Sequence, residues 1–113
     1  MSCFDRFNDS PEFLIGNICL WSSGGSKQRP LMFETSTSFF SPLINETILE
    51  VYGNDSVLYV KSVYYDKINY YRIIHETGKK VMEIKKVDLV GYQKGISNKL
   101  KRLFVKTDTK LSS

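Results

Sequence analysis

The residue types that could carry out catalysis are few in this chain, and no partners for them can be named. His75 is the only histidine, and it lies between Ile74 and Glu76 in a segment with a strand pattern. General acid–base catalysis needs a positioned partner beside the histidine. Cys3 and Cys19 are sixteen positions apart and, with one histidine, lack the paired spacing of a zinc site. We therefore interpret His75 as a structural or surface residue and expect no metal and no cofactor.

The segment 22–27, Ser-Ser-Gly-Gly-Ser-Lys, has the composition of a phosphate-binding loop but not its spacing. A phosphate loop has Gly-x-x-x-x-Gly-Lys-Ser/Thr and leads into a helix. Here the glycines are adjacent, and Pro30 with a strand pattern follows. We therefore interpret the segment as a flexible loop between strands.

Aromatic and basic residues offer binding chemistry instead. Two pairs of adjacent tyrosines, Tyr64 with Tyr65 and Tyr70 with Tyr71, must point to opposite faces of a sheet, so one of each pair faces outward. Exposed aromatic rings beside lysines could stack nucleic-acid bases or anchor a protein, while the alternative is that they only cover a small core. The candidate contact residues are Lys79, Lys80, Lys94, Lys99, Lys101, Arg102, Tyr65 and Tyr70.

The net charge of +4 is unevenly distributed along the chain. Residues 79–113 carry ten Lys/Arg and three Asp/Glu, whereas residues 1–78 carry six Lys/Arg and nine Asp/Glu. Such a gradient attracts a phosphate backbone or an acidic protein surface. The alternative is a solvated basic end that aids solubility.

Two short segments, 16–18 (Gly-Asn-Ile) and 29–32 (Arg-Pro-Leu-Met), carry a family resemblance. They resemble the opening of MazF/PemK-type toxin ribonucleases, in which a Gly-Asp-Ile/Val strand leads through a loop to Arg-Pro-hydrophobic residues. The resemblance implies that Arg29 helps to cleave RNA together with a Ser or Thr further on. Asn17 stands where the family has Asp, and no threonine matches the second catalytic position.

Strand patterns dominate the chain and must position these residues. Runs of β-branched and aromatic residues at 47–52, 57–65, 70–76 and 80–87 are separated by turn residues and predict an antiparallel meander. Segments 13–21 and 31–34 predict two more strands, and 35–42 predicts a long loop. About six strands favour a mainly β fold, a small antiparallel barrel or bent sheet of SH3-like or OB-like kind. The residues expected to face the core are Leu58, Val60, Ser62, Tyr64, Met82 and Ile84.

The end of the chain changes its periodicity. Ile96, Leu100, Leu103 and Phe104 fall on one face of a helix, with Ser97 placed to cap it. We therefore predict a short basic C-terminal helix at 96–104. It either docks on the domain's own sheet, which we favour, or waits for a partner.

The length of 113 residues predicts one domain, 13–104, between an N-terminal arm at 1–12 and a flexible tail at 105–113. The start lacks a signal-peptide pattern, and no apolar stretch is long enough to cross a membrane, so we expect a cytoplasmic protein. We predict a non-enzymatic binding module, an accessory or inhibitor protein of a phage or mobile element that acts on a host protein or nucleic-acid complex. The alternatives are a toxin endoribonuclease or a single-stranded nucleic-acid-binding domain.

Overall fold

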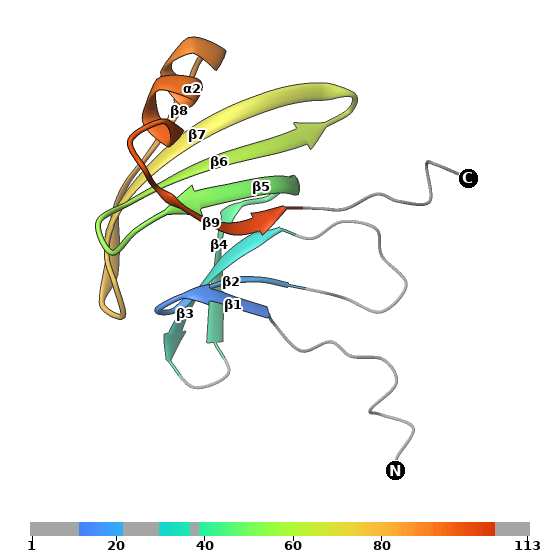
Figure 1. The fold of residues 1–113 in the computed structure, drawn as a ribbon. Helices are drawn as coiled ribbons and strands as arrows, with labels where there is room; N and C mark the ends of the chain where they lie inside the picture. The colour runs from blue at the N-terminus through green and yellow to red at the C-terminus, as the bar shows by residue number, and fades with distance from the viewer. Residues whose placement is uncertain (1–11, 22–29, 37–38, 106–113) are drawn as a thin grey trace.

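The computed structural model describes residues 12–21, 30–36 and 39–105. In this part of the chain nine strands and one helix follow one another (Figure 1). The strands are β1 (Glu12–Ile15), β2 (Ile18–Leu20), β3 (Leu31–Ser36), β4 (Phe39–Ile44), β5 (Thr47–Gly53), β6 (Val57–Tyr64), β7 (Lys67–Glu76), β8 (Lys80–Val87) and β9 (Lys101–Val105). The helix, α2 (Leu89–Ile96), lies between β8 and β9.

The strands form two antiparallel sheets that pack face to face. The N-terminal sheet has the order β1-β2-β3-β4, and the C-terminal sheet has the order β8-β7-β6-β5-β9. The predicted mainly β fold is therefore confirmed. The described strands do not close into one small barrel, and nine strands stand where about six were expected.

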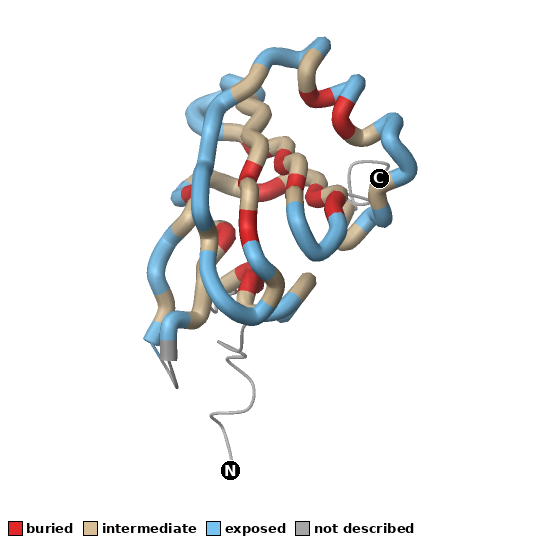
Figure 2. The backbone as a smooth tube through the Cα atoms, turned by 90° about the vertical axis from the view of Figure 1, so that its left-hand side faces the viewer, coloured by how far each residue is buried: buried red, intermediate tan, exposed pale blue. Residues whose placement is uncertain are grey.

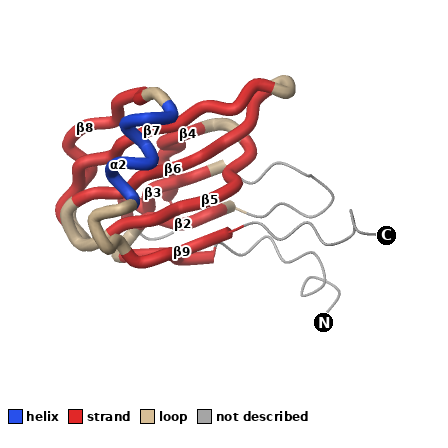
Figure 3. The backbone as a smooth tube through the Cα atoms, turned by 45° about the horizontal axis from the view of Figure 1, so that its top comes forward, coloured by secondary structure: helices blue, strands red, loops and turns tan. Residues whose placement is uncertain are grey.

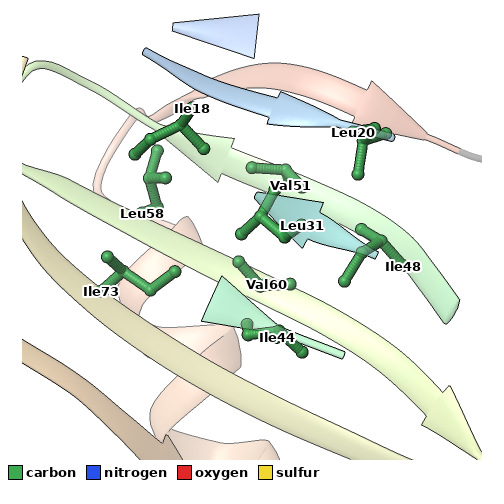
Figure 4. Close-up of a cluster of buried hydrophobic side chains, with 9 residues drawn as sticks. All are labelled: Ile18, Leu20, Leu31, Ile44, Ile48, Val51, Leu58, Val60 and Ile73. Atoms are coloured by element: carbon green, nitrogen blue, oxygen red, sulfur yellow. The ribbon is translucent and has the colours of Figure 1, made fainter. Parts of the chain in front are cut away.

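The core lies between the two sheets, where alternate residues of each strand point inward. Along β6, Leu58, Val60 and Ser62 are fully buried, which confirms the predicted inner face up to Ser62. Stretches of the backbone in which buried residues alternate with less buried ones are visible in Figure 2. The nine buried residues of the core cluster come from both sheets (Figure 4): Ile18, Leu20, Leu31, Ile44, Ile48, Val51, Leu58, Val60 and Ile73. Each such aliphatic side chain contributes about 1.5 to 3 kcal/mol by leaving water.

The N-terminal half contains more strands than expected. The segment 13–21 forms two strands joined by a turn, because Gly16 takes a positive φ of 54° there. The Asn17 amide donates to the Glu34 carbonyl over 2.9 Å and ties this turn to β3. The expected long loop at 35–42 is wrong, because most of it belongs to β3 and β4. Its Pro42 is tolerated since β4 is an edge strand.

The predicted helix at 96–104 is also wrong. The observed helix begins after its N-cap Asp88, whose side chain accepts from Gly91 N–H over 2.8 Å. It ends at Ile96, and Ser97 is its C-terminal cap and not an N-cap as expected. Lys99 has a positive φ of 65°, which ends any helical continuation. β9 follows and pairs with β5, and its Leu103 and Phe104 pack against the core. The apolar residues thus dock on the domain as favoured, but as a strand.

Three residues expected to face the core are exposed. Met82 and Ile84 are 51% and 39% exposed, because β8 is the edge of the C-terminal sheet. Tyr64 is 45% exposed, because the turn comes earlier than expected: Tyr65 and Asp66 form it, and β7 begins at Lys67.

The predicted arm at 1–12 and the tail at 105–113 lie outside the described residues, apart from one residue of each. Glu12 belongs to β1, and Val105 ends β9. Within the described part, no helix is long and apolar enough to cross a membrane.

Candidate binding surface

Helix α2 crosses the outer face of the C-terminal sheet and forms a third layer (Figure 3). It leaves edge strand β8, packs on β7 and β6, and delivers the chain to β9 at the opposite edge. Gly95 lies directly on the ring of Tyr59, where any Cβ would overlap the ring atoms. The helix therefore reaches the sheet closely enough to cover its central tyrosines.

Tyr70, one of the predicted contact residues, belongs to this helix–sheet interface. Its ring lies 4.7 Å from that of Tyr92, and the Tyr59 ring lies 6.4 Å from the same residue. The Tyr92 hydroxyl donates to Glu50 Oε1 over 2.9 Å. Burial and this hydrogen bond hold the pKa of Tyr92 far above its usual value. Tyr70 therefore packs against the helix and does not offer a free ring face.

Six predicted basic residues lie near one end of the C-terminal sheet, on its two edge strands, the adjoining turns and the end of α2; we call this the basic end: Lys79, Lys80, Lys94, Lys99, Lys101 and Arg102. All six are exposed. Lys101 pairs with Gly53, beside the β5–β6 turn. Asp55 of the β5–β6 turn accepts a hydrogen bond from Thr77 of the β7–β8 turn, so the two turns are neighbours. Lys94 lies in the last turn of α2, which leads into β9. Five strands at about 4.8 Å spacing spread this charge over roughly 19 Å.

The positive charge at the basic end is little neutralised. Asp55 and Glu76 are the nearby acidic residues, and Glu76 stands opposite Lys80 across the β7–β8 pair. The ion pair between Arg72 and Glu83, at 3.8 Å, lies away from this end. Uncompensated surface cations attract anions most strongly at low ionic strength.

Other polar groups at this end are used to hold its turns together. The Asn54 side chain accepts from the backbone N–H groups of Ser56 and Val57. The backbone carbonyl oxygen of Asn54 lies 2.9 Å from His75 Nε2. His75 is only 3% exposed. The single histidine therefore has a structural contact, as its isolation in the sequence indicates.

A second polar network lies toward the other end of β6 and β7. The Glu46 carboxylate accepts from Ser62 over 2.6 Å, from Asn69 over 3.1 Å and from Tyr71 over 2.8 Å. Burial opposes its ionisation, but these bonds and the charge of Lys86 outweigh burial and lower the pKa of Glu46. Burial and the bond to Glu46 raise the pKa of Tyr71 to about 12. A carboxylate held ionised by three neutral donors stabilises the fold and is poorly suited to proton transfer.

The remaining candidate for nucleophilic chemistry is Cys19, whose side chain is fully buried. Burial, with the charge of Glu34, raises the pKa of its thiol to about 11. A buried protonated thiol is unreactive. No group of three His, Cys, Asp or Glu side chains that could hold a metal occurs in the described ranges. Cys3, the segment 22–27 and Arg29 lie outside them.

Tyr65 lies at the far end of the β6–β7 hairpin from the basic end. The ten residues of β7 separate the two, which is about 30 Å at 3.3 Å per residue. Six of the eight predicted residues thus lie at one end of the C-terminal sheet, spread over its width, whereas Tyr70 lies beneath the helix and Tyr65 lies elsewhere. Asp66, beside Tyr65 in the turn, was not among the predicted contact residues, although the sequence pattern already placed it in the turn after β6.

No protein-family model, curated protein or solved structure matches this chain. The toxin-ribonuclease resemblance therefore gains no support from these comparisons.

Proposed function

We propose that the protein is a non-enzymatic module that binds nucleic acid through the phosphate backbone at its basic end. The observation that carries the proposal is that Lys79, Lys80, Lys94, Lys99, Lys101 and Arg102 all lie exposed at one end of the sheet. Lysine and arginine side chains at such a surface exchange small counterions for phosphates without reading base sequence.

The charges of the two sheets support this orientation. The described strands of the N-terminal sheet contain neither Lys nor Arg, whereas the C-terminal sheet, α2 and the turns between these elements carry all the described basic residues. A polyanion is therefore attracted to the part of the molecule that carries the described basic residues. This asymmetry favours one docking side.

Fluorescence anisotropy with labelled single-stranded and double-stranded oligonucleotides tests the proposal. Affinity should fall steeply with salt, since each neutralised phosphate contributes about −0.7 to −0.9 to the slope of log K against log salt. Lys99→Glu with Lys101→Glu should weaken binding by about tenfold or more at low salt. The double variant Lys67→Glu with Lys85→Glu has the same net charge and should change affinity by less than about threefold, because both positions lie outside the basic end.

Three results would overturn this function. If no oligonucleotide binds at low salt, an acidic protein surface becomes the partner for the basic end. If both double variants weaken binding equally, overall charge and not the basic end is responsible. If labelled RNA is cleaved during the assay and Arg29→Ala abolishes cleavage while the fold is retained, the toxin-ribonuclease reading replaces a binding module.

A further inference from the structure

The tip of the β6–β7 hairpin is built from residues that suit its turn poorly. Tyr65 and Asp66 both have positive φ, 49° and 67°. A two-residue hairpin turn with two positive φ values favours Asn-Gly, and a bulky tyrosine in this region is strained. Strained residues of this kind concentrate at functional sites.

The same tip exposes large apolar groups. Tyr65 is 83% exposed, and Tyr64 and Ile68 are 45% and 44% exposed. The first residue of β5, Thr47, pairs with Val63, so the tip extends beyond the end of β5 (Figure 1). On the other side, β8 ends opposite Tyr70. The aromatic residues therefore stand clear of both neighbouring strands.

A shallow hollow of about 250 Å³ lies between this tip and the start of β5. It is lined by Thr47, Val63, Tyr64, Tyr65 and Asp66. The two tyrosine rings meet edge to face, with centroids 4.4 Å apart and planes at 61°. The hollow thus combines aromatic walls with an exposed carboxylate.

Asp66 is the charged residue among those that line the hollow. The charge of Glu46, which has Lys86 near it, also reaches Tyr64: the neighbouring Tyr65 raises the pKa of Tyr64 most, and desolvation and Glu46 add to the effect. Lys67 stands opposite Tyr64 across the hairpin but does not line the hollow. A cation is therefore favoured in the hollow over an anion.

We propose that this hollow binds the guanidinium group of an arginine on a partner protein. A guanidinium stacks on the face of a tyrosine ring and pairs with a carboxylate, here Tyr65 and Asp66. The methylene stem of the arginine lies along Val63 and Tyr64. A nucleotide fits this tip less well, because its phosphate would lie near the carboxylate of Asp66. The tip is also about 30 Å from the basic end, whose cations would attract the phosphate.

Nuclear magnetic resonance titration with two matched peptides tests the site. The probes are acetyl-Gly-Ser-Arg-Ser-Gly-amide and the same peptide with citrulline, which keeps the shape of arginine and removes its charge. The arginine peptide should shift the backbone amides of residues 63–68 and saturate in the millimolar range. The citrulline peptide should bind at least about fivefold more weakly.

Point variants assign the contacts. Tyr65→Phe should retain binding of the arginine peptide, because the ring face remains, whereas Tyr65→Leu should weaken it about three- to fivefold. Asp66→Asn should also weaken it while keeping the turn, since Asn tolerates positive φ. Lys67→Ala is the control and should leave affinity unchanged or slightly higher. Lys99→Glu with Lys101→Glu should bind the peptide normally, so the tip is tested independently of the proposed nucleic-acid function.

Several outcomes would overturn the proposal. The tip is not a cation site if the citrulline peptide binds as well as the arginine peptide, or if Tyr65→Leu leaves affinity unchanged. Adenosine monophosphate shifting the same amides more strongly than the arginine peptide would assign the tip to nucleobases. Shifts of residues 63–68 on raising the protein concentration without peptide would assign it to a second copy of this chain.

Discussion

The two ends of the β6–β7 hairpin differ in how their polar and aromatic residues are used. At the basic end, Asn54, His75 and Thr77 hold neighbouring turns together through hydrogen bonds to backbone groups. At the tip, Tyr65 and Asp66 occupy a turn that other residues would form more easily. Polar residues at the basic end therefore form hydrogen bonds within the fold, whereas Tyr65 and Asp66 at the tip remain exposed.

This difference separates structural from functional candidates. A histidine or an asparagine that already bonds to a backbone carbonyl or amide has less capacity left for a ligand. The lysines of the basic end and the rings of the tip make no such contribution to the fold. The candidates for binding are thus the residues that the packing does not explain.

The largest expected effect on stability comes from substituting Gly16, which lies against the β7–β8 turn at the basic end. A Cβ at Gly16 would lie 2.6 Å from the backbone nitrogen of Gly78, and its φ is positive, so Gly16→Ala should lower the free energy of unfolding by about 2 to 4 kcal/mol. Gly78→Ala is the matched control: it has a positive φ but nothing within 4 Å, so it should cost only about 1 to 2 kcal/mol. Urea denaturation measures both. Equal costs would show that the two turns are not in close contact.

Glu46 bonds to β6 and β7 near the tip of the hairpin, and its contribution to stability should depend on pH. Its lowered pKa means that the ionised form stabilises the native state, so this stabilisation is present above pH 4.5 and is lost as the pH falls through the lower native value. Glu46→Gln should cost about 1 to 3 kcal/mol at pH 7, since the buried Ser62 loses its charged acceptor. The difference between the two proteins should shrink in acid. A constant difference from pH 7 to pH 3 would contradict this role.

Replacing the tip turn should have the smallest effect on stability and the opposite sign. Tyr65→Asn with Asp66→Gly installs the residues that this turn favours and should raise the free energy of unfolding by about 0.5 to 1 kcal/mol. The same change should remove the arginine site. Thermal unfolding followed by circular dichroism checks the first part. A lower melting temperature would mean that the tyrosine contributes to the fold after all.

The strands from β5 to β8 could be predicted from the sequence because their alternation and turn residues agree with each other. The C-terminal segment could not, because Leu100, Leu103 and Phe104 have helical spacing as well as the composition of a strand. The segment forms a strand because it pairs with the free edge of β5. Local sequence does not show that this edge is available. For the same reason the exposure of Met82 and Ile84 depended on β8 being an edge.

The candidate site was predictable in composition but not in arrangement. The run of basic residues after Gly78 identified the basic end, and the path of α2 and β9 then places Lys94, Lys99, Lys101 and Arg102 at the same end of the sheet as Lys79 and Lys80. The tyrosines had to be placed by the fold. Tyr70 lies beneath α2 because Gly95 allows the helix to approach the sheet, and no pattern in the sequence gives that distance.

The path of α2 also sets the order in which the C-terminal sheet can be completed. β9 pairs with β5, yet β6, β7, β8 and α2 all lie between them in the chain. During synthesis, β5 to β8 emerge early and form a local meander with short connections. The fifth strand can join only after the helix has emerged and crossed the face. Until then one edge of β5 stays open to edge-to-edge association, and the last residues of the described chain remove this risk only when β9 pairs with β5.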